Sequence, residues 1–209
     1  MKMKRISVQS EIEKAIQQLE KGSLISAQDF LDIGNYEAAK RALSRLNSEG
    51  KLTRVFRGLY QTPNYNAFLK KDIGASPNKV AEKFAEKFGW TIAPAEDTAL
   101  NELGLSTHVP AKYTFISDGP TKKYTLDNGI DIYFKHKANK EISKLSKKEA
   151  IVIEAIQTIS QEKMNDQIRQ KLFNTLTEDE MKHLLEQGKS MRYWIYEELK
   201  NIQDRHDYL

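Results

Sequence analysis

The sequence predicts an α+β protein with three parts: an N-terminal winged helix-turn-helix, a small central α+β domain and a C-terminal helical bundle. Three observations predict it. A basic helical stripe runs directly into a short hairpin pattern in residues 35–60, short strand-like runs follow between residues 113 and 134, and only helical stripes occur after residue 146. We therefore expect the winged module in residues 1–62, a linker in 63–77, the α+β domain in 78–145 and the helices in 146–209.

Two helical segments open the chain. The first has an apolar stripe at helical spacing, which ends before Gly22 and comprises Val8, Ile12, Ala15, Ile16 and Leu19. Ser26 and Asp29, three residues apart, resemble a capping box, so we expect a short helix from there to Gly34.

A third helix is expected to start at Asn35, a residue type whose side chain caps a free backbone N–H. Its apolar positions follow i, i+3, i+4 and i+7 spacing and predict the buried face, Ala39, Ala42, Leu43 and Leu46. Gly50 suits the left-handed conformation that ends a helix. Apolar residues then flank Arg57-Gly58 and predict a short hairpin, the wing.

The outward positions of this helix and the wing are rich in cations. Arg41 and Arg45 are four residues apart and share one solvent face. In a winged helix-turn-helix this helix enters the major groove, where arginine can bond to guanine, while flanking cations touch phosphates. We expect Arg41 and Arg45 to contact base edges and the other residues of the set mainly to contact phosphates. The expected contacts to double-stranded DNA are Tyr36, Lys40, Arg41, Ser44, Arg45, Lys51, Arg54 and Arg57.

Two other functions stay open for this module. A basic amphipathic helix is often only a solvated surface, and a winged helix can serve as a protein-interaction adaptor without sequence-specific DNA binding. A nuclease with a winged-helix targeting domain would need a carboxylate or histidine cluster in residues 78–145, and the sequence offers no such cluster.

Composition limits the remaining classes. Residues 1–72 carry 13 Lys and Arg against 8 Asp and Glu, residues 73–148 carry 12 against 9, and residues 149–209 carry 8 against 12, so the basic end is N-terminal. The chain has no cysteine and no long apolar run, which predicts a soluble cytoplasmic protein without a membrane span. We expect no cofactor, no metal site and no enzyme, because phosphate-binding glycine loops are missing and the four histidines have no ligand spacing. Those histidines are His108, His136, His183 and His206.

The central and C-terminal parts are predicted from shorter signals. A helical stripe from Val80 to Phe88 and another from Ala99 to Leu103 are each followed by a glycine. Three strand candidates lie in 113–116, 124–126 and 130–134, the last two separated by the tight turn Asp127-Asn128-Gly129. Further on, two capping boxes are expected to open helices. They are the pairs Ser146 with Glu149 and Thr177 with Glu180.

Three segments carry a resemblance to a known family: AKRALSRLNSEGKLTRVFRGLYQTP, TIAPAEDTALNELGLSTHVPAKYTFISDGP and IYFKHKANKEI. They resemble antitoxin-like proteins related to the type IV abortive-infection antitoxins of the AbiE type, over roughly residues 5–145. One departure is Ala95-Glu96, where such sequences carry a small Ser-Gly pair.

The resemblance implies an antitoxin that represses its own operon through the winged helix. Its later region would oppose a nucleotidyltransferase toxin encoded beside it, and the two proteins need not form a stable complex. The matching antitoxin surface would be Thr98, Asn101, Ser106, Thr107 and His108. Polar residues in such a loop also commonly brace the fold, and that interpretation stays open. We further expect two copies to pair on a repeated operator.

Overall fold

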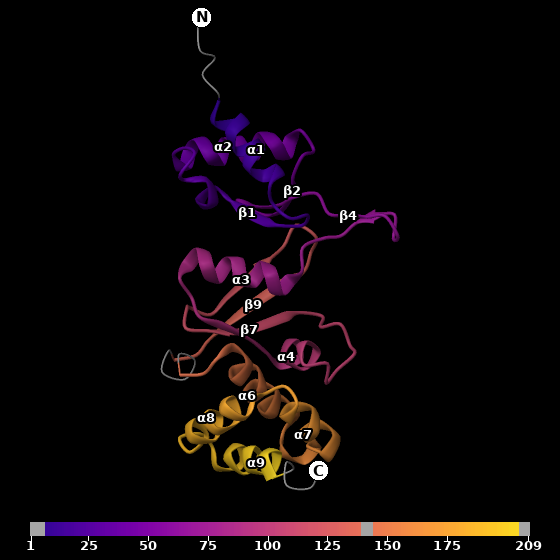
Figure 1. Cartoon of the computed structure of the whole chain (residues 1–209), viewed down its shortest axis with the longest axis vertical. Helices are drawn as coiled ribbons and strands as arrows, with labels where there is room; N and C mark the ends of the chain where they lie inside the picture. The colour runs from indigo at the N-terminus through magenta and orange to yellow at the C-terminus, as the bar shows by residue number, and fades with distance from the viewer. Residues whose placement is uncertain (1–6, 139–143, 205–209) are drawn as a thin grey trace, which may run out of the picture. The chain divides into compact units, whose positions relative to one another are not determined.

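The computed structural model describes residues 7–138 and 144–204 and has the α+β class that the sequence predicts (Figure 1). Its packing divides the chain into two compact units in place of three parts. The first contains residues 1–83 and 125–129, and the second contains residues 84–124 and 130–209. The central strands and the C-terminal helices therefore share one unit.

The first unit has the element order of a winged helix-turn-helix. Helix α1 (Val8–Gln17) is followed by β1 (Leu24–Ser26), the short 3₁₀ helix η1 (Ala27–Phe30), α2 (Tyr36–Ser48), β2 (Thr53–Phe56) and β3 (Leu59–Gln61). The three strands form an antiparallel sheet in the order β1-β3-β2. Strand β1 is absent from the sequence prediction, because three residues are too few to reveal an alternating pattern.

Caps and a small apolar core fix this unit. The Asn35 side chain accepts the Ala38 N–H at 2.9 Å, and the Asp29 carboxylate accepts the Ser26 N–H at 2.6 Å, so both predicted helix starts are confirmed. The predicted inner face of α2 is buried against α1 and η1. Its four residues, each at most 3 % exposed, are Ala39, Ala42, Leu43 and Leu46.

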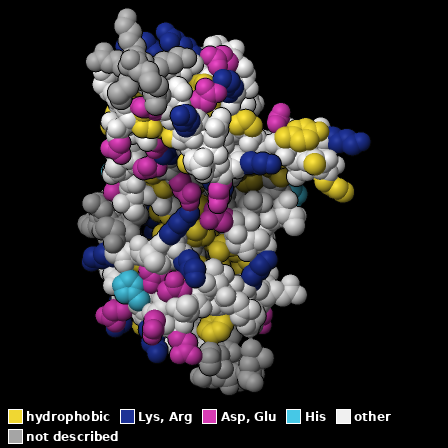
Figure 2. Space-filling model, turned by 45° about the horizontal axis from the view of Figure 1, so that its top comes forward, with side chains coloured by type: hydrophobic (Ala, Val, Ile, Leu, Met, Phe, Trp, Pro, Cys, Tyr) yellow, Lys and Arg dark blue, Asp and Glu magenta, His cyan; other side chains and the backbone are white. Residues whose placement is uncertain are grey.

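A two-stranded ribbon forms inside the predicted linker. It pairs β4 (Tyr65–Asn66) with β5 (Lys71–Asp72). The Asn66 side chain accepts the Leu69 N–H at 2.9 Å and so closes the turn. The ribbon projects from its unit, with apolar side chains near its end (Figures 1 and 2).

The second unit is built on a four-stranded sheet. After α3 (Pro77–Phe88), whose first part belongs to the other unit, come β6 (Ile92–Ala95), α4 (Glu96–Glu102), β7 (Tyr113–Ser117), β8 (Lys122–Thr125) and β9 (Asp131–His136). The strand order is β6-β7-β9-β8, with β6 antiparallel and β9 parallel to β7. Aromatic rings from α3 and the strands stack together, including Phe84 on Tyr124 at 4.6 Å and Phe88 on Trp90 at 4.7 Å between ring centroids.

The C-terminal helices join the same sheet through α6. They are α6 (Lys147–Ile159), the 3₁₀ turn η2 (Gln161–Lys163), α7 (Asp166–Phe173), α8 (Glu178–Gly188) and α9 (Tyr193–Gln203). The predicted capping boxes at Ser146 and Thr177 are both present. Helix α6 contacts β6 and α4 with one side and the other helices with the opposite side, so it is buried nearly all round. This double packing explains why the bundle is no separate unit.

Candidate nucleic-acid interface

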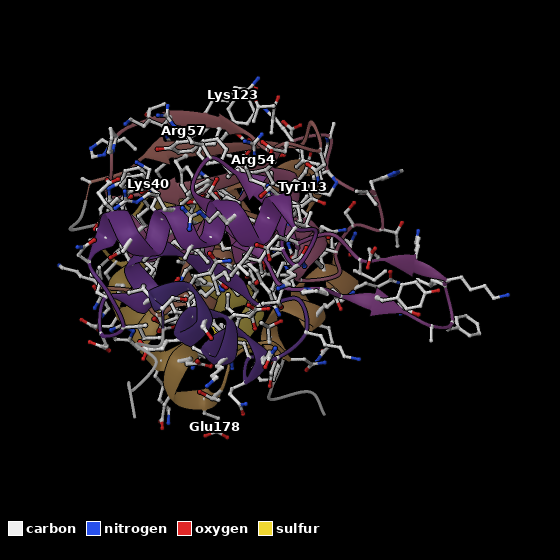
Figure 3. The ribbon with its side chains drawn as sticks, turned by 90° about the horizontal axis from the view of Figure 1, so that it is seen from above. Lys40, Arg54, Arg57, Tyr113, Lys123 and Glu178 are labelled. Atoms are coloured by element: carbon white, nitrogen blue, oxygen red, sulfur yellow. The ribbon has the colours of Figure 1, made fainter. Side chains whose placement is uncertain are left out.

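The predicted DNA-contacting residues lie on the outer face of α2, in the segment that links α2 to β2, in β2 and in the β2–β3 turn. All eight are exposed, while the opposite face of α2 is buried. Lys40, Arg54 and Arg57 gather along one side of α2 when the unit is seen from above (Figure 3). Tyr36 begins the same helix and is 46 % exposed, and Ser44 lies one turn after Lys40. The interface is therefore one continuous helix face with a neighbouring turn.

Among the described residues, the Arg41 and Arg45 guanidinium groups each donate one hydrogen bond, and neither acceptor is charged. The Arg41 Nε donates to the Glu37 carbonyl at 3.1 Å, and the Arg45 Nη1 donates to the Gln9 side-chain oxygen at 3.5 Å. Neither guanidinium forms an ion pair with a carboxylate of residues 7–138 or 144–204. A bond at 3.5 Å is at the limit of useful hydrogen-bond geometry. Each side chain can therefore turn toward a ligand at the cost of one hydrogen bond.

Two further cations are also accessible. Lys40 lies 3.5 Å from Glu37, but both side chains are more than half exposed, and such a pair contributes little. Arg57 occupies the turn between β2 and β3 beside Gly58, whose φ of +76° a side chain would strain. Within the described part of the chain, Arg57 has no hydrogen-bond or ion-pair partner. Its guanidinium is free to meet an anion.

Lys51 and Arg54 differ from the other cations because carboxylates hold them. The Lys51 Nζ lies 2.5 Å from Glu13 and 3.0 Å from Glu49, and the hydrogen bond to Glu13 is the main reason that its pKa is raised. The Arg54 Nε donates to Asp127 at 2.6 Å. Both belong to the predicted set, but each would have to leave a carboxylate before it could bind a phosphate.

A bulge in the wing explains the position of Asp127. The β2–β3 register shifts between Arg54 and Phe56, which takes the Val55 carbonyl out of regular pairing. That carbonyl accepts the Asp127 N–H at 3.0 Å, next to the ion pair with Arg54. Sequence reasoning missed Glu13 and Asp127 because they lie 38 and 73 residues from their partners.

The expected antitoxin surface is only partly a surface. Thr98 is 2 % exposed and its hydroxyl accepts the Thr114 N–H at 2.8 Å, so its placement on a surface is wrong; the hydroxyl serves the junction of α4 and β7. Asn101 is exposed but donates to the carbonyls of Ser106 and His108, at 3.4 and 3.1 Å. The His108 N–H in turn donates to the Ser106 hydroxyl at 3.2 Å. These contacts brace the loop, while Thr107 and His108 remain exposed.

Acidic residues elsewhere serve the fold. Glu96 opens α4 and is held by Lys135 and Lys112. In residues 7–138 and 144–204, no three His, Asp or Glu side chains gather in a group that could bind a metal; His206 lies outside the described residues. No helix in the described ranges has the length and apolarity needed to cross a membrane.

Comparison with known proteins places the chain in a family. No curated protein matches it. A family model described as a family of unknown function, DUF6088, matches residues 11–184. The match runs from α1 into α8, includes the whole candidate interface and covers well over half of the 209 residues. The chain therefore belongs to the DUF6088 family.

Proposed function

We propose that the first unit binds double-stranded DNA through α2 and the β2–β3 turn, and that the protein acts in the cytoplasm as an antitoxin that represses its own operon. In this proposal it opposes a nucleotidyltransferase toxin without needing a stable complex with it. The observation that carries the DNA-binding part is the outer face of α2. Arg41 and Arg45 lie there without an ion-pair partner among the described residues, opposite a buried face and in the same unit as the exposed Arg57 turn.

Each part of the interface has a distinct task in this proposal. Arg41 and Arg45 read base edges in the major groove, where a guanidinium can bond twice to one guanine. Lys40 and Arg57 contact phosphates, as do the hydroxyls of Tyr36 and Ser44. Lys51 and Arg54 mainly hold the wing in place, because their carboxylate partners compete with phosphate. Two copies bound to a repeated operator would raise the affinity of such a small module.

The direct test is binding of the full chain to its own upstream DNA and to scrambled DNA of equal length, at two salt concentrations. Preference for the upstream DNA should persist at the higher salt and disappear in the double variant Arg41→Ala/Arg45→Ala. The matched control is Lys79→Ala, which removes an exposed cation of α3 outside the interface. Circular dichroism confirms that each variant is folded. Equal, salt-sensitive binding of both DNAs would reject sequence reading.

Single variants separate base reading from phosphate contact. Arg45→Ala should lose about 1–3 kcal/mol of binding free energy on the upstream DNA and relax specificity at one position. Arg57→Ala should weaken binding to all sequences alike and lower the salt slope by about one. Equal losses on both DNAs from both variants would contradict the assignment of Arg45 to a base.

The antitoxin role needs a separate experiment. Co-expression with a nucleotidyltransferase encoded beside the gene should restore growth that the toxin alone stops. Because direct contact is not required in this proposal, rescue is expected even where the two proteins do not co-purify. If growth is not restored while DNA binding is intact, the protein is a regulator without antitoxin activity.

A protein-interaction adaptor is the second candidate function. It is favoured by the β4–β5 ribbon, which exposes Tyr65, Phe68 and Leu69 together. This reading predicts little affinity for any DNA and loss of a protein partner when these side chains are replaced. The DNA-binding experiment above distinguishes the two candidates directly.

A further inference from the structure

The second unit contains a cavity that the proposed DNA contacts do not use. Its volume is about 800 Å³, and it is open to solvent and lined by the end of β7, the residues on both sides of the β9–α6 connection, α6, and the junction of α8 and α9. Pockets for small ligands commonly have volumes between about 300 and 1,000 Å³ and combine apolar walls with a few polar groups. Here the apolar wall includes Ile153, Met191 and Ile195.

Among the described residues that line this cavity, cations outnumber carboxylates. These cations are Lys137, Lys144 and Arg192, and the carboxylate among them is Glu154, which lies 2.6 Å from the Lys137 Nζ. Lys144 and Arg192 have no ion-pair or hydrogen-bond partner within the described ranges. Within the described residues two positive charges are therefore left over, and an anion that enters the cavity would not have to displace a carboxylate of these residues from them.

The same cavity offers a surface for an aromatic ring. Trp194 packs partly against the helical core and remains half-buried, and it contributes to the lining. Gln157 and Gln187 add side-chain amides, which can donate to and accept from the edge of a base. A tryptophan beside cations and amides matches the mixed chemistry of a nucleotide, whose base stacks and whose phosphates carry charge.

We propose that this cavity binds a free nucleotide, with its phosphates at Arg192 and Lys144 and its base against Trp194. Helix α9 begins at this position, and no side chain caps it. The Ile195 N–H donates to the Arg192 carbonyl, which leaves the N–H groups of Tyr193 and Trp194 to add to phosphate binding. The proposal stands apart from DNA binding, since the cavity and α2 belong to different units. The protein would then have a nucleotide-binding site in addition to its proposed DNA-binding face.

The experiment is isothermal titration calorimetry of the full chain with ATP, GTP, CTP and UTP, and with inorganic phosphate as a separate probe. At least one nucleotide should bind with a stoichiometry of one, and phosphate alone should bind far more weakly because it lacks the base. Arg192→Ala and Lys144→Ala should each weaken nucleotide binding about tenfold or more, since a hydrogen bond to a charged group is worth at least that factor. Trp194→Phe should weaken it less, because an aromatic face remains.

Lys182→Ala is the matched control. Lys182 is an exposed cation of α8 that does not line the cavity, so its loss should leave the affinity unchanged. Arg192 and Lys144 are also exposed, and thermal unfolding of their variants should match that of the unchanged chain. The proposal is overturned if no nucleotide binds the folded chain. It is also overturned if Arg192→Ala and Lys144→Ala bind as tightly as Lys182→Ala, or if phosphate binds as tightly as the nucleotides.

Discussion

At the scale of single residues, the ring of Trp90 leaves no room for a side chain at position 119. A Cβ built on Gly119 would lie 2.4 Å from Cε2 of Trp90, and its φ is not in the left-handed region. The indole also stacks on Phe88 and meets Phe134 edge-on, with ring centroids 4.7 and 5.5 Å apart, so it cannot move aside freely. The absence of a side chain at residue 119 is thus a packing requirement and not a backbone one.

We therefore expect Gly119→Ala to lower the free energy of unfolding by about 1–3 kcal/mol, the usual cost of overpacking a filled core. Chemical denaturation of the full chain measures it. Gly74→Ala is the matched control, because a Cβ there meets no atom within 4 Å and φ is again unexceptional. Equal stability of the two variants would mean that Trp90 has room to rotate.

The start of α4 has an unusual backbone conformation that the sequence does not predict. Glu96 has a φ of +52°, and Ala95 occupies the N-cap position without a capping side chain. A serine at residue 95 would cap this helix, and a glycine at residue 96 would adopt that φ without strain. A carboxylate in the first turn of a helix is electrostatically favourable, and Glu96 lies in the first turn of α4. The sequence could not reveal the backbone conformation, nor that Lys112, just before β7, and Lys135 of β9 hold the carboxylate.

At the scale of elements, the capping box of α8 makes stability depend on pH. The Thr177 N–H donates to the Glu180 carboxylate at 2.8 Å, and this bond is the main reason that the pKa of Glu180 lies below its ordinary value of 4.5. A lowered folded-state pKa means that the contribution is complete above the unfolded value and is lost as the pH falls through the folded value.

We expect Glu180→Gln to lower the free energy of unfolding at pH 7 by about 0.5–1 kcal/mol, as for other helix caps that are partly exposed. The difference from the unchanged chain should shrink as the pH falls below 4.5. Urea unfolding at pH 7 and at about pH 3 gives both values. Asp179→Asn, one residue away, removes a first-turn charge without removing this hydrogen bond. A difference for Glu180→Gln that does not change with pH would argue against the capping role.

The β4–β5 ribbon should contribute little to the stability of the chain. Phe68 is 92 % exposed at its turn, so Phe68→Ser should change the free energy of unfolding by less than about 0.5 kcal/mol. Phe115→Ala is the contrasting variant. Phe115 is 1 % exposed, so this substitution should lower the free energy of unfolding by about 3–5 kcal/mol. Both are measured by chemical denaturation at low protein concentration. A large loss for Phe68→Ser would mean that the ribbon packs against another surface in solution.

Local elements were predictable, and distant pairing was not. Helix α2, its Asn35 cap and the β2–β3 turn follow from residues within one or two helical turns of each other, and these predictions are confirmed. The parallel pairing of β7 with β9 joins strands separated by β8, so no local spacing reveals it. The same reason applies to the candidate interface: exposure of its cations followed from helical spacing, but the partners of Lys51 and Arg54 did not.

At the scale of the whole chain, the distribution of charge along the sequence does not follow the boundary between the two packing units. The excess of cations is N-terminal and the excess of carboxylates is C-terminal, while the packing boundary runs through α3 and returns at the turn after β8. Three expected parts became two units because α6 is buried on nearly every side and packs against both the sheet and the other helices. A helix of that kind marks an interior position, even where the surrounding sequence changes from strands to helices.

The C-terminal helices contain a buried ion pair between α7 and α9. The stability of the second unit should depend on whether both of its charges are present. Glu198 of α9 is 3 % exposed, and Arg169 of α7 donates to both of its oxygens, at 2.9 and 3.1 Å. Arg169→Met should cost about 3–5 kcal/mol, because it leaves a buried carboxylate unpaired. Arg169→Met/Glu198→Leu should recover most of that loss, since an apolar pair of similar volume needs no compensation. A double-mutant cycle by chemical denaturation measures the coupling.

Lys189→Ala, which breaks the exposed pair with Glu186, is the control and should change stability by less than about 0.5 kcal/mol. If the double variant is as unstable as Arg169→Met alone, the bidentate geometry itself, and not the need to neutralise Glu198, joins α7 to α9.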